Sequence, residues 1–321
     1  MRRTVSSALG TVTRSAIAAL PIPAALAMAL VMAMAASPLS APAAAVIPTR
    51  CPWDGSVVIS GLGSLENLEF DGTGGMLLSR TDQRSGQIYR LTPDGTGSTV
   101  VPAVPAPGSI TVDGSTAYFT TGNSFLSGII GRRDGTITEV DLSTGDPTVV
   151  AENLTMPNGM ARLPDGSFVV SRNLGLITGL TRVSADGTDT DRFAPWLTTT
   201  NGVTYDRARN AIITSLDLHP VATLAVIDVS NPKRISKFNL GLFGLFGFPD
   251  DLTVGADGAV YLAMDGGSIV RIDLDANTAC TVASRLFGST SVRFGSGPGW
   301  DTGSLYSVDL GGAVHRLTPP D

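Results

Sequence analysis

The chain has 321 residues, of which 43% are hydrophobic, 16% charged and 6% aromatic, and its formal net charge is −6. A disordered chain carries more charge and fewer apolar residues, so most of this sequence is expected to fold. The acidic balance excludes nucleic acid as the main partner, because binding to phosphate needs a basic surface.

The first 45 residues have the pattern of a secretory signal peptide. Three arginines precede an apolar run over 16–36, and small residues over 41–45 follow it. A basic region, an apolar region and an A-x-A site predict cleavage after Ala45 and secretion of residues 46–321. An uncleaved membrane anchor is the alternative, since the run is long enough to span a bilayer. No second stretch has that length, so we expect no transmembrane segment after cleavage.

Removing residues 1–45 changes the formal net charge from −6 to −9 and leaves two cysteines, Cys51 and Cys280. An exported chain with two cysteines usually pairs them. The sequence therefore predicts a disulfide that closes a long loop, provided that the fold brings both residues together. Two buried free thiols are the alternative.

A repeated pattern of short strands follows, without an amphipathic helix of useful length. Each copy has a polar residue, a strand, a turn with Asp or Gly, and a second strand. The copies start at residues 66, 108, 158, 201, 250 and 290, at intervals of about 40 to 50 residues. This period, with about four strands per unit, predicts an all-β fold, a six-bladed β-propeller over residues 46–321.

The last copy, from Thr290, runs short of strands before the chain ends at Asp321. The β-rich run over 56–60 can supply the missing outer strand and close the ring. That closure would bring Cys51 near the outer strand of the fifth blade, where Cys280 lies. The N-terminal strand and the disulfide are therefore two predictions that support each other.

A ring of oxygen-bearing side chains is expected at one mouth of the channel. The first strand of every blade lines the channel in the same direction, so the residues that open these strands lie together. Four of them can be metal ligands: Glu66, Asn158, Asn201 and Asp250. Two carboxylates and two amide oxygens favour a divalent cation, Ca²⁺ first, with Mg²⁺ or Mn²⁺ as alternatives, over zinc. Each residue taken alone is also a common turn residue.

The sequence around these positions resembles the senescence-marker-protein/gluconolactonase (LRE-like) family and the related paraoxonases. The phrases are Glu66-Asn67-Leu68, Pro157-Asn158-Gly159, Thr200-Asn201-Gly202-Val203 and Phe248-Pro249-Asp250-Asp251. The resemblance implies a six-bladed propeller whose catalytic divalent cation is held by Glu66, Asn158, Asn201 and Asp250. It also implies hydrolysis of lactones and, in some members, of aryl or phosphate esters.

The chain departs from these families at residues that assist the reaction. The paraoxonase form implies a structural calcium near Asn67 and Asp251. The functional His that paraoxonases carry on the second blade is replaced by Pro107-Gly108. The Asp that follows the first metal-binding Asn in gluconolactonases is replaced by Gly159. The metal ligands are thus kept better than the catalytic helpers.

A mechanism follows for a lactone or ester substrate. The cation would polarise the carbonyl and stabilise the oxyanion. Asp250, Asp251 or His219 would activate water as the general base, and the loop that holds His219 is expected at the same mouth. A lone His is more often structural than catalytic. The apolar loop over 241–248 is either a wall of the substrate site or a loop packed on its neighbouring blades.

The sequence therefore predicts a secreted, monomeric, metal-dependent lactonase or esterase with a small-molecule substrate. Two alternatives stay open. One is a noncatalytic binding propeller in which Ca²⁺ only stabilises the fold. The other is a strictosidine-synthase-like enzyme, which shares the architecture but needs a catalytic Glu and no metal. The fold alone does not choose among them.

Overall fold

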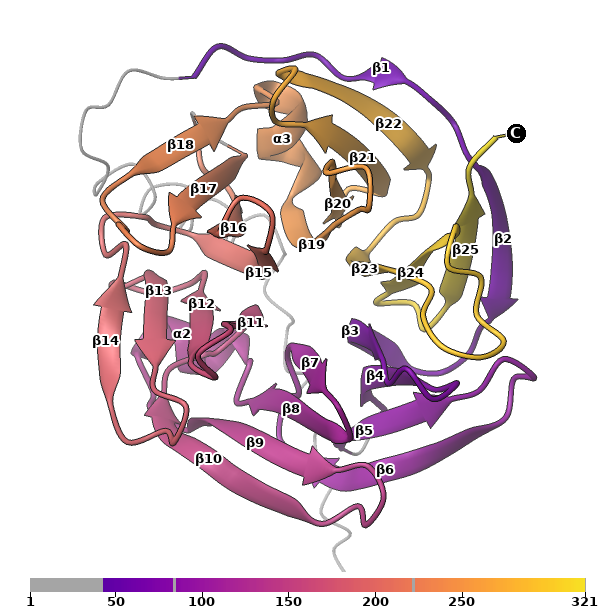
Figure 1. The fold of residues 1–321 in the computed structure, drawn as a ribbon, viewed down its shortest axis with the longest axis vertical. Helices are drawn as coiled ribbons and strands as arrows, with labels where there is room; N and C mark the ends of the chain where they lie inside the picture. The colour runs from indigo at the N-terminus through magenta and orange to yellow at the C-terminus, as the bar shows by residue number, and fades with distance from the viewer. Residues whose placement is uncertain (1–42, 83–84, 221–222, 321) are drawn as a thin grey trace, which may run out of the picture.

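The computed structural model describes residues 43–82, 85–220 and 223–320. The predicted signal peptide over 1–45 therefore falls almost entirely outside the described residues. Within them, six sheets surround a central channel, as Figure 1 shows along the channel axis, and the strands of each blade are antiparallel. The prediction of an all-β, six-bladed β-propeller is confirmed.

In each blade the first strand lines the channel and the later strands follow outward (Figure 1). Blades 1 to 3 consist of β3 (Ser64–Phe70), β4 (Met76–Thr81), β5 (Gly86–Leu91) and β6 (Gly97–Val104); β7 (Ile110–Asp113), β8 (Thr116–Thr121), β9 (Gly135–Asp141) and β10 (Pro147–Leu154); and β11 (Met160–Arg162), β12 (Phe168–Arg172), β13 (Gly179–Val183) and β14 (Thr190–Phe193). Blades 4 to 6 consist of β15 (Thr200–Asp206), β16 (Ala211–Leu216), β17 (Leu224–Asp228) and β18 (Ile235–Phe238); β19 (Pro249–Val254), β20 (Val260–Met264), β21 (Ser268–Asp273) and β22 (Thr278–Ser284); and β23 (Ser289–Phe294), β24 (Leu305–Asp309), β25 (Val314–Thr318) and β2 (Asp54–Ile59).

The hydrophobic core is divided into six clusters, one between each pair of neighbouring blades. Successive side chains of a strand point to opposite faces of its sheet. Leu77 of β4 therefore packs against blade 2, and Leu78 packs against blade 6. Burying one such leucine stabilises the fold by about 1.5–3 kcal/mol. Each blade is held from both sides, which fixes the positions of the first strands around the channel.

The N-terminal segment closes the ring as predicted. Strand β2 pairs antiparallel with β25 and completes blade 6. Just before it, β1 (Thr49–Arg50) pairs parallel with β22 on blade 5. The disulfide between Cys51 and Cys280 joins the same two segments across a sequence separation of 229 residues, so the predicted pairing is confirmed.

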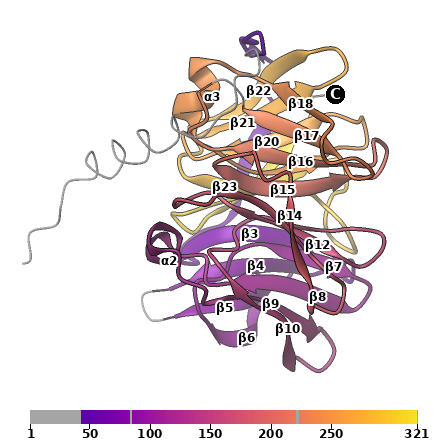
Figure 2. The ribbon, with the colours of Figure 1, turned by 90° about the vertical axis from the view of Figure 1, so that its left-hand side faces the viewer.

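Two short helices lie at the same face of the propeller, α2 (Phe125–Ile130) and α3 (Leu242–Gly247), as Figure 2 shows. None of the helices in the described part of the chain is long and apolar enough to cross a membrane. The first strands start at this face, which we call the mouth face. Most exposed large apolar side chains among the described residues lie on its connections: Phe125, Leu126, Ile129, Ile130, Leu176, Ile177, Trp196, Leu242, Phe243, Phe246, Phe287 and Leu310. The hairpin turns of the opposite face contribute none of that set.

Candidate metal centre

The four predicted ligands lie together at the mouth face. Glu66, Asn158, Asn201 and Asp250, from four different blades, line one cavity of about 210 Å³. We call it the central cavity. Thr290, which opens blade 6, lines it too. The prediction that residues opening the first strands converge at one mouth agrees with this geometry, whereas their binding of a metal stays a prediction.

A repeated backbone turn delivers these residues to the cavity. In blades 2 to 5 the residue two positions before the start of the copy has a positive φ, from 42° to 55°: Ala106, Met156, Thr199 and Phe248. The left-handed conformation costs about 1–2 kcal/mol for a residue with a side chain. It reverses the chain above the channel and directs the next residues down into it. Strain of this kind is concentrated at functional sites in proteins.

Hydroxyl groups fix the backbone of the ring from the neighbouring blade. The side chains of Ser79, Thr120 and Ser171, near the ends of second strands, donate to the carbonyl oxygens of Gly108, Asn158 and Asn201 in the next blade. The backbones of Gly108, Asn158 and Asn201 are therefore each held by two blades. This arrangement leaves the side chains of the two asparagines for other contacts.

Glycine is required after both ring asparagines. A Cβ on Gly159 would lie 2.4 Å from the carbonyl oxygen of Asn201, and a Cβ on Gly202 would lie 2.4 Å from Cα of Asp251. The first strands approach each other at backbone distance here. The absence of an Asp at position 159, noted in the sequence, therefore has a packing reason.

A second ring of polar residues, which was not predicted from the sequence, also lines the cavity. Its members directly follow the second strands of blades 2 to 5 or lie two residues beyond them: Asn123, Asn173, Asp217 and Asp265. In an antiparallel hairpin the second strand ends at the edge where the first begins. The signal was thus present in the sequence as a polar residue at the end of each second strand.

Several of these side chains have oxygens without a hydrogen-bond partner. Asn123 Nδ2 donates to Glu66 Oε1 at 2.7 Å, and Asn201 Nδ2 donates to the carbonyl oxygen of Pro249 at 3.3 Å. These contacts orient the carboxylate and the amide. The buried oxygens left unpaired are Oδ1 of Asn123, Asn173, Asn201, Asp217 and Asp265.

Unpaired acceptor oxygens fit a hard cation. A buried acceptor without a donor costs about 1–3 kcal/mol, and carboxylate and amide oxygens are the ligands that Ca²⁺ and Mg²⁺ prefer. Among the described residues, no three His, Cys, Asp or Glu side chains are placed to hold a metal by themselves. A cation here would therefore need the amide oxygens of Asn158 and Asn201 as well as the carboxylates of Glu66 and Asp250.

The carboxylates of the cavity destabilise one another's charged forms. Burial first, and then the charge of Asp265, raise the pKa of Glu66 to about 7. The same two causes raise the pKa of Asp217 to about 7. Burial raises the pKa of Asp265 to about 6. Asp250 has the most like charges around it, and burial together with these charges raises its pKa well above the usual value. A bound divalent cation would remove this repulsion.

A charged layer closes the channel below the cavity. Asp251 Oδ2 accepts from Asn67 Nδ2 and Ser291 Oγ, both at 2.7 Å, and lies 2.8 Å from Nη1 of Arg293. Arg293 also contacts Glu69 Oε2 at 3.1 Å. The resemblance to paraoxonases implies a structural calcium near Asn67 and Asp251. In the structure the guanidinium of Arg293 supplies the positive charge beside Asp251, which does not line the central cavity.

His219 and the loop over 241–248 also lie away from the central cavity. His219 is buried, and burial together with Lys237 lowers its pKa to about 4, which keeps the ring neutral at pH 7. The loop forms α3, which leaves Leu242 and Phe246 exposed at the mouth face. Neither segment contributes to the cavity that the ring residues form.

Sequence comparison gives one short family match. The family described as strictosidine synthase-like, N-terminal, matches residues 247–272, a segment that contains Asp250 and Asp265. No curated protein sequence matches the chain.

Solved structures give broader similarity. A gluconolactonase from Xanthomonas campestris is 15% identical with a TM-score of 0.67, over 87% of this chain and 98% of that one. A luciferin-regenerating enzyme is 14% identical with a TM-score of 0.63, over 83% of this chain and 95% of that one. A virginiamycin B lyase from Staphylococcus aureus is 18% identical with a TM-score of 0.56, over 81% of this chain and 82% of that one.

The chain has a gluconolactonase-like propeller fold. At identities of 14–18%, the similarity shows a shared fold and nothing about the reaction. The same fold occurs in a virginiamycin B lyase. The fold does not determine the reaction of this chain, which depends on the residues of the central cavity.

Proposed function

We propose that this protein is a secreted, metal-dependent hydrolase of lactones or related esters. The observation that carries the proposal is the convergence of Glu66, Asn158, Asn201 and Asp250 in one cavity at the mouth of the channel. The unpaired Oδ1 of Asn201 and the mutual repulsion of the carboxylates support a divalent cation at this position. The disulfide supports export, because such bonds persist in oxidising compartments.

The proposed ligands would hold the cation at the open end of the channel. When bound there, a divalent cation polarises a substrate carbonyl and stabilises the oxyanion that develops from it. Asn123 keeps the Glu66 carboxylate in place through its 2.7 Å hydrogen bond. The layer around Asp251 and Arg293 closes the cavity from below, so substrate and water enter from the mouth face.

Asp265 is the best-placed general base. It lines the cavity, and its Oδ1 has no hydrogen-bond partner. Its carboxylate would accept a proton from water, whose oxygen forms a bond to the lactone carbonyl carbon. The ring C–O bond then breaks, and the proton returns to the alkoxide oxygen to give the hydroxy acid. Asp250 is needed as a ligand, and neither Asp251 nor His219 lines the cavity.

The function is tested by hydrolysis assays with and without metal. We expect the mature protein to hydrolyse members of a panel of aldonolactones, alkyl lactones and phenyl acetate. A chelator should abolish this activity, and Ca²⁺, Mg²⁺ or Mn²⁺ should restore it. If no substrate turns over while calorimetry shows tight Ca²⁺ binding, the protein is a binding propeller.

A strictosidine-synthase-like enzyme is the second candidate, because the matching segment over 247–272 contains two cavity residues. The chelator separates the two enzymes. Such an enzyme needs no metal, so its activity would survive chelation.

Replacing the proposed base should slow the reaction without unfolding the protein. We expect Asp265→Asn to lower kcat by about 10²–10⁴-fold, the usual contribution of a general base. Thermal stability should be unchanged or higher, because one of several clustered like charges is removed. Asp146→Asn, in an exposed turn of the opposite face, is the matched control and should keep full activity. Wild-type kcat in Asp265→Asn would rule out this base.

A further inference from the structure

A smaller pocket lies beside the central cavity at the mouth face. It measures about 180 Å³ and lies over blade 3, between the connection 173–178 and the connection 194–199. Asn173, Leu174 and Asp217 line both this pocket and the central cavity. We call it the side pocket. The two spaces are therefore neighbours that share three wall residues.

The outer wall of the side pocket is apolar. Leu176, Ile177 and Trp196 line it, and their exposed fractions are 88%, 62% and 38%. Large apolar side chains that stay exposed beside a pocket gain free energy when a ligand covers them. The wall therefore favours an apolar group.

The inner wall carries unpaired hydrogen-bonding atoms. Asn173 Oδ1, Asp217 Oδ1 and the hydroxyl oxygens of Thr198 and Thr199 are buried without a partner. The side chain of Asn173 is only 8% exposed. The Asn173 amide oxygen only accepts hydrogen bonds, as an ionised carboxylate does, whereas the two Thr hydroxyls can also donate. The inner wall therefore favours a ligand that carries an N–H or O–H group.

The walls are held in place by the fold. The backbone N–H of Thr199 donates to Thr178 Oγ1 at 3.2 Å, and that of Asp217 donates to the carbonyl oxygen of Thr199 at 2.8 Å. Arg172 ties the other connection to α2 through its 2.8 Å hydrogen bond to the carbonyl oxygen of Gly128. Thr199 has φ of 55°, a strained value for a β-branched residue. The pocket is therefore already formed before a ligand enters.

We infer that the side pocket binds an apolar substituent of the substrate, joined to the reacting part through a hydrogen-bond donor. The inference rests on the proposed function, since the carbonyl would lie in the central cavity. With a volume of about 180 Å³, the pocket has room for a short alkyl group. The preferred substrate class is thus amphipathic, rather than a sugar lactone with hydroxyl groups all around its ring.

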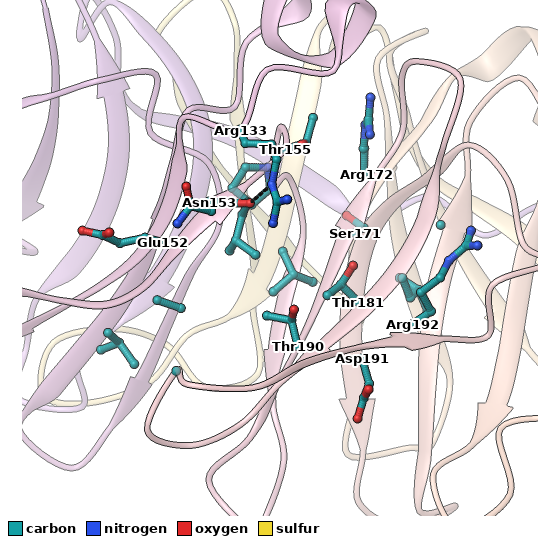
Figure 3. A pocket seen from close by; sticks show the side chains of 18 of the residues that line it. Arg133, Glu152, Asn153, Thr155, Ser171, Arg172, Thr181, Thr190, Asp191 and Arg192 are labelled. Atoms are coloured by element: carbon teal, nitrogen blue, oxygen red, sulfur yellow. Dashed lines mark hydrogen bonds between the residues drawn. The ribbon is translucent and has the colours of Figure 1, made fainter.

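A groove next to the side pocket could hold the rest of a longer substituent. Ile177, Thr178 and Arg192 line both the side pocket and a groove of about 690 Å³ between blades 2 and 3. Figure 3 shows this groove, with Asn153 on one side and Thr181 and Arg192 on the other. Arg133 donates to the carbonyl oxygen of Asn153 within it. A chain that fills the side pocket would leave it past Arg192.

Binding of a non-hydrolysable probe tests the pocket without any reaction. We expect N-hexylacetamide, which has an N–H group and a six-carbon chain, to bind at least tenfold more tightly than 1-methoxyhexane, which lacks the donor. Calorimetry on the chelator-treated protein measures both. Trp196→Ala should weaken binding of the amide about tenfold. Leu242→Ala, which removes an exposed apolar side chain of the same face outside the pocket, should not. Equal binding of the two probes, or equal effects of the two variants, would overturn the inference.

Hydrolysis of γ-lactones with alkyl substituents of none to six carbons tests the link to the reaction. Each added methylene should raise kcat/KM about fourfold until the pocket is full. Trp196→Ala and Ile177→Ser should both reduce the ratio of long-chain to short-chain kcat/KM, and Leu242→Ala should keep it.

The two proposals fail in different ways. Turnover without dependence on chain length and without probe binding would refute the side pocket and leave the hydrolase. Probe binding with the expected response to Trp196→Ala, but without hydrolysis of any lactone, would refute the hydrolase and leave the pocket as a ligand site.

Discussion

Glu66→Gln is expected to abolish lactone hydrolysis and to weaken Ca²⁺ binding more than about 100-fold. Loss of groups that only support metal ligands already costs about 10–100-fold in affinity, and this substitution removes half of the negative charge of the proposed ligand set. Gln has the size of Glu, and its oxygen can still accept from Asn123, so the fold should be kept. Calorimetric titration with Ca²⁺ and the lactone assay measure the two effects.

Glu66→Gln should lower Ca²⁺ affinity, but it should raise the stability of the metal-free protein. Because the buried Glu66 carboxylate is repelled by its neighbours, with its pKa raised to about 7, its neutral replacement should stabilise the metal-free protein at pH 8. Asp146→Asn, far from the cavity, should change neither property. Unaltered Ca²⁺ affinity in Glu66→Gln would show that the ring residues are ordinary turn residues and would remove the metal centre.

The second large effect is a pH-dependent stability that Ca²⁺ reverses. The pKa values of Glu66 and Asp217 are raised to about 7, that of Asp265 to about 6, and that of Asp250 higher still. Ordinary carboxyl groups of the unfolded chain titrate near 4. Between these values the folded chain binds more protons than the unfolded chain, so its free energy of unfolding falls as the pH rises.

One buried group acts in the opposite direction over part of this range. The pKa of His219 is lowered to about 4, so below its usual value of about 6.5 the unfolded chain takes up the proton and the folded chain does not. That contribution makes stability rise with pH through about 6.5 and fades over roughly the next pH unit. A decrease in stability from pH 6.5 to 8 has the opposite sign and therefore reports the carboxylates of the cavity.

Urea denaturation of chelator-treated protein at pH 5, 6, 7 and 8 measures this slope. Stability should decrease between pH 6.5 and 8, and Ca²⁺ at 100 times its Kd should add about 2.7 kcal/mol at pH 8. At the same Ca²⁺ concentration the gain in stability should be smaller at pH 5, because protons compete with Ca²⁺ for the same oxygens. A metal-free protein whose stability is flat from pH 6.5 to 8 would contradict the raised pKa values of the cavity.

The repeat and its consequences were accessible from the sequence because they depend on local chemistry. Asp-Gly turns and short strands recur at intervals of about 40 to 50 residues, and the ring closure follows from a last blade that lacks a strand. Each first strand in the structure begins within two residues of its predicted start. The positions of Glu66, Asn158, Asn201 and Asp250 at one mouth follow directly, because all first strands run in the same direction.

Contacts between blades could not be predicted from the repeat, because they join residues that are distant in sequence. Asp251 and Arg293 lie 42 positions apart, and only the packing of β19 against β23 brings the guanidinium to the carboxylate. By its place in the sequence, Asp251 is a candidate base. In the structure that residue is part of the layer that closes the channel. His219 is a candidate base because of its loop, and its buried side chain does not line the central cavity.

The sequence by itself thus determined the fold, the disulfide partners and the ring of four oxygen-bearing residues. These depend on periodicity, on the number of cysteines and on strand direction, which a linear pattern contains. Only the tertiary structure decided that Asn123, Asn173, Asp217 and Asp265 join the same cavity, and that a side pocket lies beside it. Those facts depend on how the connections of neighbouring blades fold over the mouth, where the pattern of the repeats ends.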